Sequence, residues 1–225
     1  MKNSKSLFFA ILLLTFGLTT YGQTNKFYIG VDGGPSLIFL RGSKVIDNHQ
    51  KSAIGFSGGL FFQFNFKNVI SLRTNVAFER KGGKFTAPAT DNNGTSIGEL
   101  TACSSIDYLT LPVLVRATFG NKIQYFINAG PYFGYLLRDR VVVKGDNILT
   151  FIGDYTASDK RFDTGISTGL GLSVPLNKNL AVSFEIRNNL GLYNISAYPI
   201  DNNGTIKTNS TNGLFSFTYK LGQRI

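Results

Sequence analysis

Eight strand-like segments, joined by connections that are alternately short and long, constrain the fold of this chain more than any other feature. The segments cover residues 27–39, 52–66, 70–81, 106–119, 123–138, 162–175, 180–190 and 212–222. Several of them contain 11 or more residues. That length suits a tilted strand that crosses a membrane better than a strand of a soluble sheet, which usually has about five or six residues.

The connections between the segments point the same way. Three are tight turns, at Lys67-Asn68, Gly120-Asn121-Lys122 and Asn177-Lys178-Asn179. Four are long and polar, at about 40–51, 82–105, 139–161 and 191–211. Strict alternation of this kind is typical of barrels with short periplasmic turns and long external loops. We therefore predict an all-β fold, an eight-stranded antiparallel up-and-down transmembrane β-barrel.

Each segment has an apolar face and a polar face, because residue types alternate with a period of two. Alternation alone does not say which face is inside, but the glycines of the segments fall on the polar face. These are Gly30, Gly34, Gly55, Gly59, Gly130, Gly134, Gly165, Gly169 and Gly171. An eight-stranded barrel has little interior room, so small residues belong on its inner face, whereas glycine on a solvent face would only weaken the strands. The polar face is therefore predicted to line the lumen and the apolar face to meet lipid.

This assignment places ten charged side chains in the lumen. They are Asp32, Arg73, Glu79, Lys81, Arg116, Arg138, Asp163, Glu185, Arg187 and Lys220. We expect Lys81 and Arg138 to lie at the outer strand ends, where water reaches them, which leaves four acids and four bases deeper inside. Buried charges are tolerable only when they are paired and hydrogen-bonded. The sequence therefore predicts a salt-bridged plug, with a conduction pathway as the alternative.

Two prolines interrupt the predicted ladder between the fourth and fifth segments, because proline lacks a backbone donor. If Phe119 pairs with Ile123 across the tight turn, then Pro112 lies opposite Gly130 and Pro131 is one step away. We expect a local break or bulge at this place, either as a harmless irregularity or as a lateral weak point.

The first part of the chain has the form of a secretory signal. A basic start precedes an apolar run at 7–18, which is too short to span a bilayer as a stable helix, and small residues follow at Thr20 and Gly22. We expect cleavage after Gly22, with residues 1–22 as the signal peptide and 23–225 as the barrel domain. An uncleaved anchor is the alternative.

Candidate chemistry is sparse. The single histidine, His49, has Asp47 and Ser52 nearby in the first long connection, but such proximity is common in polar loops. We expect no metal-binding site, because the chain has only one His and one Cys. The lone Cys103 cannot form an internal disulfide. No glycine-rich phosphate loop is present. We therefore expect no enzyme, no catalytic, cofactor-binding or metal-binding residues, and no cofactor.

One short motif occurs twice in the long connections. Asp-Asn-Asn-Gly-Thr stands at 91–95 and again at 201–205. Asn-Gly suits a tight turn, so turn chemistry is the simpler interpretation. The functional alternative is a paired calcium or ligand contact at the rim of the barrel.

Three stretches of the chain carry a family resemblance. They are Tyr-Leu-Thr-Leu-Pro-Val-Leu-Val-Arg at 108–116, Asn-Ala-Gly-Pro-Tyr-Phe-Gly-Tyr-Leu-Leu at 128–137, and Phe-Asp-Thr-Gly-Ile-Ser-Thr-Gly-Leu-Gly-Leu-Ser-Val at 162–174. With a leader that ends in Tyr-Gly-Gln, these stretches resemble the PorT-type outer-membrane β-barrel family of Bacteroidota. The resemblance covers nearly the whole mature chain and implies the outer-membrane β-barrel domain. The name-giving member serves a protein-secretion apparatus, and most members are barrels of unknown role.

One feature departs from that family. Such barrels usually end in an aromatic residue that the insertion machinery reads, whereas this chain ends Gln223-Arg224-Ile225.

We expect a non-enzymatic protein in the outer membrane of a Gram-negative-type bacterium, exported through the inner membrane, with a structural or binding role through its long external loops. The alternatives are a narrow channel or transporter for small apolar molecules, an accessory component of a protein-secretion apparatus, or a soluble periplasmic binding barrel. The expected partners are outer-membrane lipid and lipopolysaccharide, the insertion machinery, and a protein or ligand at the external loops. The net charge of +10 comes from scattered bases, and with export it does not indicate nucleic acid.

Overall fold

A computed structural model describes residues 26–43, 46, 50–66, 69–90, 96–145, 148–200 and 203–221. Several predictions fall outside these residues: the signal peptide at 1–22, the Lys67-Asn68 turn, Asp47 and His49, the first Asp-Asn-Asn-Gly-Thr motif at 91–95, and the C-terminal residues 223–225. Within the described residues, no helix is long and apolar enough to cross a membrane.

The described part of the chain is built almost entirely of strands. They are β1 (Phe27–Arg41), β2 (Gln50–Lys51), β3 (Ala53–Asn65), β4 (Ile70–Thr90), β5 (Ser96–Phe119), β6 (Gln124–Gly145), β7 (Ile148–Asp154), β8 (Phe162–Pro175), β9 (Leu180–Gly191) and β10 (Lys207–Leu221). A short 3-10 helix, η1 (Thr156–Ser158), follows β7.

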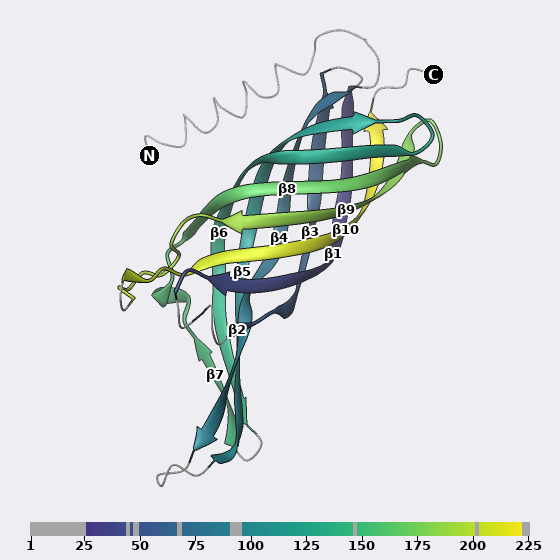
Figure 1. Ribbon diagram of the computed structural model, residues 1–225. Coiled ribbons are helices and arrows are strands. Elements are labelled where there is room, and N and C mark those ends of the chain that lie inside the picture. Colours follow the sequence, from purple (N-terminus) through teal and green to yellow (C-terminus); the bar gives the residue numbers. More distant parts are fainter. Residues whose placement is uncertain are drawn as a thin grey trace, which may run out of the picture.

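Eight of these strands form a closed ring (Figure 1). The order is β4-β3-β1-β10-β9-β8-β6-β5, and pairing of β4 with β5 completes the circle. All neighbours are antiparallel, and strands adjacent in the ring follow one another along the chain. The prediction of an eight-stranded up-and-down barrel is confirmed.

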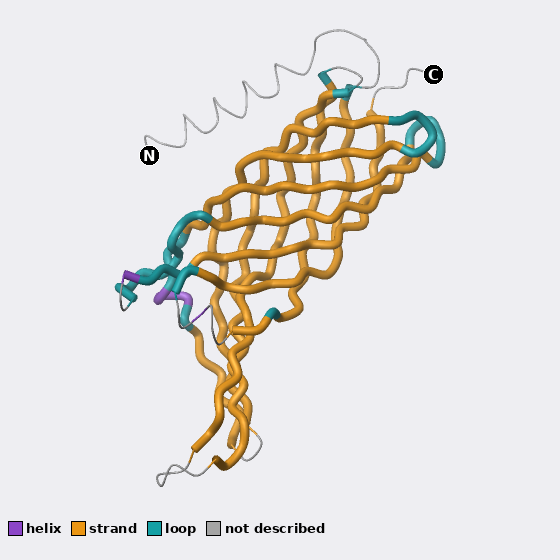
Figure 2. Tube along the Cα trace, viewed as in Figure 1, coloured by secondary structure: helices purple, strands orange, loops and turns teal. Residues whose placement is uncertain are grey.

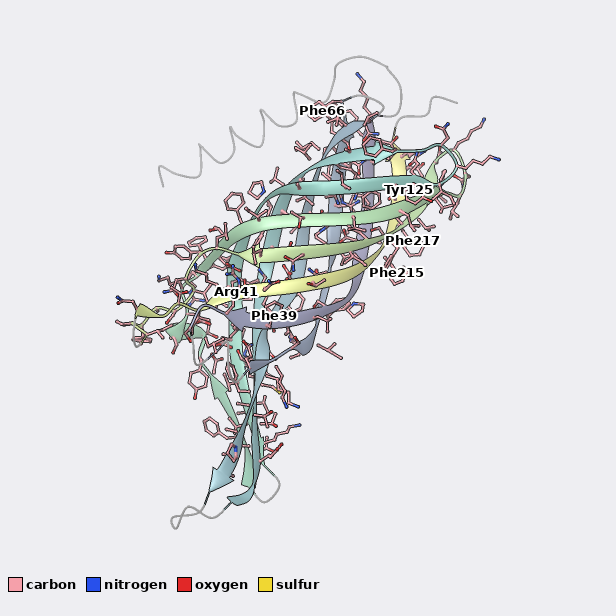
Figure 3. The ribbon with its side chains drawn as sticks, viewed as in Figure 1. Phe39, Arg41, Phe66, Tyr125, Phe215 and Phe217 are labelled. Carbon is pink, nitrogen blue, oxygen red and sulfur yellow. The ribbon has the colours of Figure 1, made fainter. Side chains whose placement is uncertain are left out.

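The apolar face of each strand is on the outside of the ring. Leu60 and Leu170 are 65% and 62% exposed, and Phe215 and Phe217 project outward from β10 (Figure 3). Polar side chains on the alternate positions are buried inside, such as Ser183 and Glu185 in β9. Exposed apolar side chains on every strand match a lipid-facing surface and exclude the soluble barrel, whose apolar face would point inward.

Three strands are much longer than the ring requires. β4, β5 and β6 contain 21, 24 and 22 residues. Their outer parts leave the ring and, with β7, continue as a sheet in the order β4-β5-β6-β7. Figures 1 and 2 show this sheet projecting from the end of the ring opposite to the start of β1 and the end of β10. We call it the β-arm, defined as residues 82–90, 96–105, 139–145 and 148–154.

The β-arm corrects the expectation that 82–105 and 139–161 are loops. The β4 and β5 residues of the β-arm are mostly small, polar or charged and lack a sustained apolar alternation, so in sequence they resemble a loop. The ladder nevertheless continues out to the pair Ala89↔Gly98.

The expected pairing across the turn after β5 is wrong by two residues. Phe119 pairs with Tyr125, and Pro112 pairs with Tyr132 rather than with Gly130. The turn takes up more residues than expected because Gly120 adopts a positive φ of 95° and the strand resumes only at Gln124.

The ladder between β5 and β6 is broken beside the two prolines, as expected, although the register differs. No pair forms between Pro112↔Tyr132 and Val115↔Ala129, a gap that contains Pro131. A separate β-bulge lies between Asp107 and Tyr108 and leaves Leu137 on β6 without a partner.

Candidate functional site

The lumen gathers charged side chains from five strands of the ring, β1, β4, β5, β8 and β9. The buried ones are Asp32, Arg73, Glu79, Lys81, Arg116, Asp163, Glu185 and Arg187, each at most 6% exposed. They comprise four acids and four bases. Each base lies within 4.0 Å of at least one of these acids, so the interior carries no uncompensated charge.

Three arginines and two acids form the cluster nearer the short turns, which we call the arginine cluster. Arg73 pairs with Asp32 at 2.7 Å. Glu185 receives two hydrogen bonds from Arg187, at 2.6 and 3.0 Å, and pairs with Arg116 at 3.1 Å. Arg187 also lies 3.9 Å from Asp32. The five side chains therefore form one connected network across the lumen.

Aromatic rings support two of these arginines. The Arg73 guanidinium lies 3.5 Å from the centroid of the Phe61 ring, and that of Arg116 lies 3.8 Å from the Phe126 ring. Stacking of this kind holds a guanidinium in place within a buried site. The rings fit because glycine faces them: a Cβ at Gly30 would overlap Phe61, and one at Gly171 would overlap Phe126.

A second cluster, the lysine cluster, lies farther from the short turns. Lys81 donates to Asp163 at 2.9 Å and lies 4.0 Å from Glu79. Tyr132 and Thr208 donate to the same Asp163 oxygen, at 3.1 and 2.7 Å. The ammonium group of Lys81 also lies 4.1 Å from the Tyr132 ring centroid. Its full burial is thus compensated by two carboxylates and an aromatic face.

Neutral side chains complete the network, and sequence reasoning did not single them out. Asn128 accepts from Arg116 and donates to Glu185, both at 2.8 Å. Asn189 and Ser210 donate to Glu79. Each stands on the polar face of its strand, so alternation could have marked them as lumenal. Their partners could not be deduced, because these depend on the register between strands.

Two expectations about charged residues are wrong. Lys81 is fully buried rather than at a wet strand end, because β4 continues to Thr90. Arg138 is on the outside, where it lies 3.3 Å from Asp154. The reason is the bulge at Leu137, since one extra residue reverses the faces of all residues that follow it.

Lys220 lies at the mouth of the lumen. It is half-buried at the end with the short turns, and its ammonium group is 5.8 Å from the Tyr28 ring centroid. The fourth deep base is therefore Lys81 and not Lys220.

A pair of carboxyl groups occupies the opposite rim, beyond the ring. Asp139 and Asp159 are close enough for each to affect the pKa of the other. Burial and the neighbouring Asp139 charge raise the pKa of Asp159 to about 7. Burial is also the main cause that raises the pKa of Asp139. Asp159 therefore titrates near neutral pH.

The charged side chains of the lumen close the interior of the barrel. The two clusters together contain four acids and four bases, and every base is paired with an acid, so no buried base is left free for a substrate. Among the described residues, no group of three or more His, Cys, Asp or Glu side chains could hold a metal ion.

The chain matches the family described as "Outer membrane protein beta-barrel domain" over residues 21–197. The matched region contains seven of the eight ring strands and the whole β-arm. A comparison with curated proteins finds no match.

Solved outer-membrane proteins are similar in structure at low sequence identity. Neisserial surface protein A (NspA) has 13% identity and a TM-score of 0.46, with 89% of this chain and 100% of NspA covered. Ail of Yersinia pestis has 10% identity and a TM-score of 0.41, with 87% and 99% covered. OprG of Pseudomonas aeruginosa has 10% identity and a TM-score of 0.39, with 90% and 99% covered.

Proposed function

Because the chain belongs to the outer membrane protein beta-barrel domain family, we propose that it is a non-enzymatic outer-membrane protein with a sealed lumen that binds a partner through its β-arm. In such barrels the short turns face the periplasm and the long connections face outward. The end with the short turns is then the periplasmic end, and the β-arm projects from the cell surface.

The observation that carries this proposal is the continuous β-ladder of the β-arm. Its outer edges, on β4 beyond Phe85 and on β7, have no strand partner among the described residues. Unpaired edges present a row of backbone donors and acceptors to which an extended segment of another protein can add. Phe151 and Ile152 on β7 are 56% and 60% exposed and offer apolar contacts beside that edge.

The sealed lumen supports a binding role over transport. The arginine cluster spans the interior, and its members are held by ion pairs and by aromatic rings. A narrow transporter for small apolar molecules would have to break this network, and its polar lining would not favour an apolar solute.

The finer family assignment rests on sequence. The three stretches that resemble the PorT-type family of Bacteroidota lie in β5, β6 and β8. The match to the broader outer-membrane barrel family agrees with a PorT-type assignment but does not identify the subfamily. A role as an accessory of a protein-secretion apparatus agrees with a partner-binding β-arm. We also propose that the protein is exported with a cleaved signal peptide and inserted by the outer-membrane machinery. In the membrane it contacts lipopolysaccharide.

Photo-crosslinking on intact cells tests the binding role. A photoreactive phenylalanine analogue at Phe151 should give a protein adduct of defined mass, whereas the same analogue at the lipid-facing Leu170 should not. The adduct should disappear when β4–β5 is shortened to a tight turn after Lys81, in a variant that still shows heat-modifiable gel mobility. Failure of Phe151 to give an adduct above that of Leu170 would contradict a binding role for the β-arm.

A further inference from the structure

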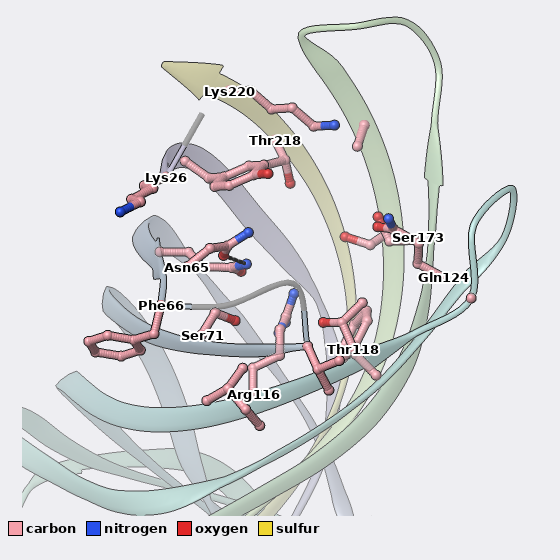
Figure 4. A pocket seen from close by; sticks show the side chains of 18 of the residues that line it. Lys26, Asn65, Phe66, Ser71, Arg116, Thr118, Gln124, Ser173, Thr218 and Lys220 are labelled. Carbon is pink, nitrogen blue, oxygen red and sulfur yellow. Dashed lines mark hydrogen bonds between the residues drawn. The ribbon is translucent and has the colours of Figure 1, made fainter. Parts of the chain in front are cut away.

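The periplasmic end of the lumen opens into a cavity of about 450 Å³. This volume falls in the range of about 300–1,000 Å³ that is typical of small-molecule sites. The cavity lies between the arginine cluster and the short turns, and it is lined from several strands of the ring (Figure 4).

The charge of the cavity has one sign. Three basic residues line it, Lys26, Arg116 and Lys220, and no acid is among the described residues of the lining. Arg116 is paired with Glu185 of the arginine cluster, at the inner end of the cavity. Lys220 has no acidic partner in the described part of the chain, and its half-buried side chain crosses the mouth (Figure 4). A cleft lined by one sign of charge within low-dielectric walls concentrates counter-ions.

A buried hydroxyl group gives independent support for a ligand. Ser71 lines the cavity and is 3% exposed, yet its Oγ has no hydrogen-bond partner. Buried polar atoms are normally satisfied, so an unpaired one requires an explanation. Thr118, Ser173 and Thr218 add further hydroxyl groups to the same wall.

The cavity ends at the arginine cluster. Arg116 forms part of its floor, held by Glu185 and Asn128. Because this floor is closed, a molecule that enters from the periplasm leaves by the same mouth. The arrangement is that of a binding pocket and not of a passage.

We propose that this cavity binds small multivalent oxyanions from the periplasm, which carry phosphate or carboxylate groups. Lys220 supplies the free positive charge, Arg116 a guanidinium donor at the floor, and Ser71 a neutral donor at the wall. The phosphate of a phospholipid headgroup in the inner leaflet offers the same chemistry as a soluble phosphate.

Pyrophosphate is a suitable probe of the site. Amide NMR spectra of the isotope-labelled, folded protein in nonionic micelles should show saturable shifts at Ser71, Thr118 and Thr218 during titration with pyrophosphate. Sodium chloride at matched ionic strength should not give these shifts. Lys220→Gln should weaken the apparent affinity about tenfold, as expected for loss of a charge-assisted hydrogen bond, and Ser71→Ala should weaken it less.

Lys178→Gln is the matched control. It removes the same charge from the same end of the barrel, but Lys178 lies in an exposed turn outside the cavity. Affinity should stay unchanged in this variant. Absence of saturable shifts in the folded wild-type protein, or equal weakening by Lys178→Gln and Lys220→Gln, would overturn the proposal.

Nanodiscs distinguish the two sources of the anion. If the headgroup is the natural ligand, phosphatidylglycerol should compete with pyrophosphate in the wild-type protein but not in Lys220→Gln. If a soluble solute is the natural ligand, the lipid should leave pyrophosphate binding to the wild-type protein unchanged.

Discussion

Lys81 is the residue on which the sealed lumen most depends. It is fully buried and is the only base of the lysine cluster, where it faces Asp163 and Glu79. A buried ion pair adds little stability over apolar packing, but loss of one partner leaves an uncompensated charge in a low-dielectric interior.

Lys81→Met should therefore lower the free energy of unfolding by about 3–5 kcal/mol. Urea unfolding followed by heat-modifiable gel mobility measures this change. The double variant Lys81→Met, Asp163→Asn should recover part of the loss, because it removes one of the two unpaired acids. Lys220→Gln, which removes a base without an acidic partner, serves as the control and should change stability by less than about 1 kcal/mol. A Lys81→Met variant as stable as Lys220→Gln would contradict the role of Lys81.

The Asp139–Asp159 pair makes the external rim sensitive to pH. The pKa of Asp159 is raised to about 7, above its ordinary value of 3.8. A carboxyl group with a raised pKa contributes stability at low pH, and this contribution is lost as the pH rises through the folded-state pKa. The rim should therefore loosen progressively between about pH 4 and pH 7.

Hydrogen exchange measures this loosening. The amides of Lys160 and Ala197, which donate to Ile195 and Ser158, should lose protection as the pH rises from 5 to 7, after correction for the intrinsic rate. Asp159→Asn should abolish the dependence, because the amide side chain does not titrate in this range. Equal pH dependence in wild-type and variant proteins would rule out this assignment.

At the scale of strands, the alternation of residue types correctly predicted features within one strand. It missed features that depend on how two strands pair. The residues of β8 and β9, and the inward position of Glu185 and Arg187, follow from a period of two within one segment. Register depends on how two strands meet, so the pairing of Phe119 and the bulge at Leu137 could not be predicted. That single bulge is why Arg138 was assigned to the wrong face.

The β-arm was missed for a different reason. Its residues in β4 and β5 are mostly small or polar and show no apolar face with a period of two, so the sequence pattern does not separate strand from loop there. Ladder pairs such as Phe85↔Ala102 and Thr101↔Lys144 are formed by residues that read as polar connections.

Exchange mass spectrometry tests whether the β-arm is an ordered sheet. Peptides from 84–88 and 99–103 should be protected by at least about tenfold over the rate of an unstructured chain, because their amides are paired in a ladder. The same peptides in the urea-unfolded protein provide the unprotected reference. Exchange of the β-arm in the folded protein as fast as in that reference would show that 82–105 is a loop after all.

At the scale of the whole molecule, the two ends of the barrel differ in character. The external end carries the β-arm with its unpaired edges, and the periplasmic end carries a cationic cavity. Between them, the arginine and lysine clusters fill the lumen with paired charges. This arrangement makes the barrel a sealed anchor that presents separate surfaces to the two sides of the membrane.

Single-channel recording in a planar bilayer tests the sealed lumen most directly. The folded wild-type protein should give no steady conductance at moderate voltage, because Arg116, Glu185 and Arg187 close the lumen. A known porin inserted in the same bilayer verifies that channels would be detected. Steady, reproducible conductance that accompanies insertion of the folded protein would contradict the account.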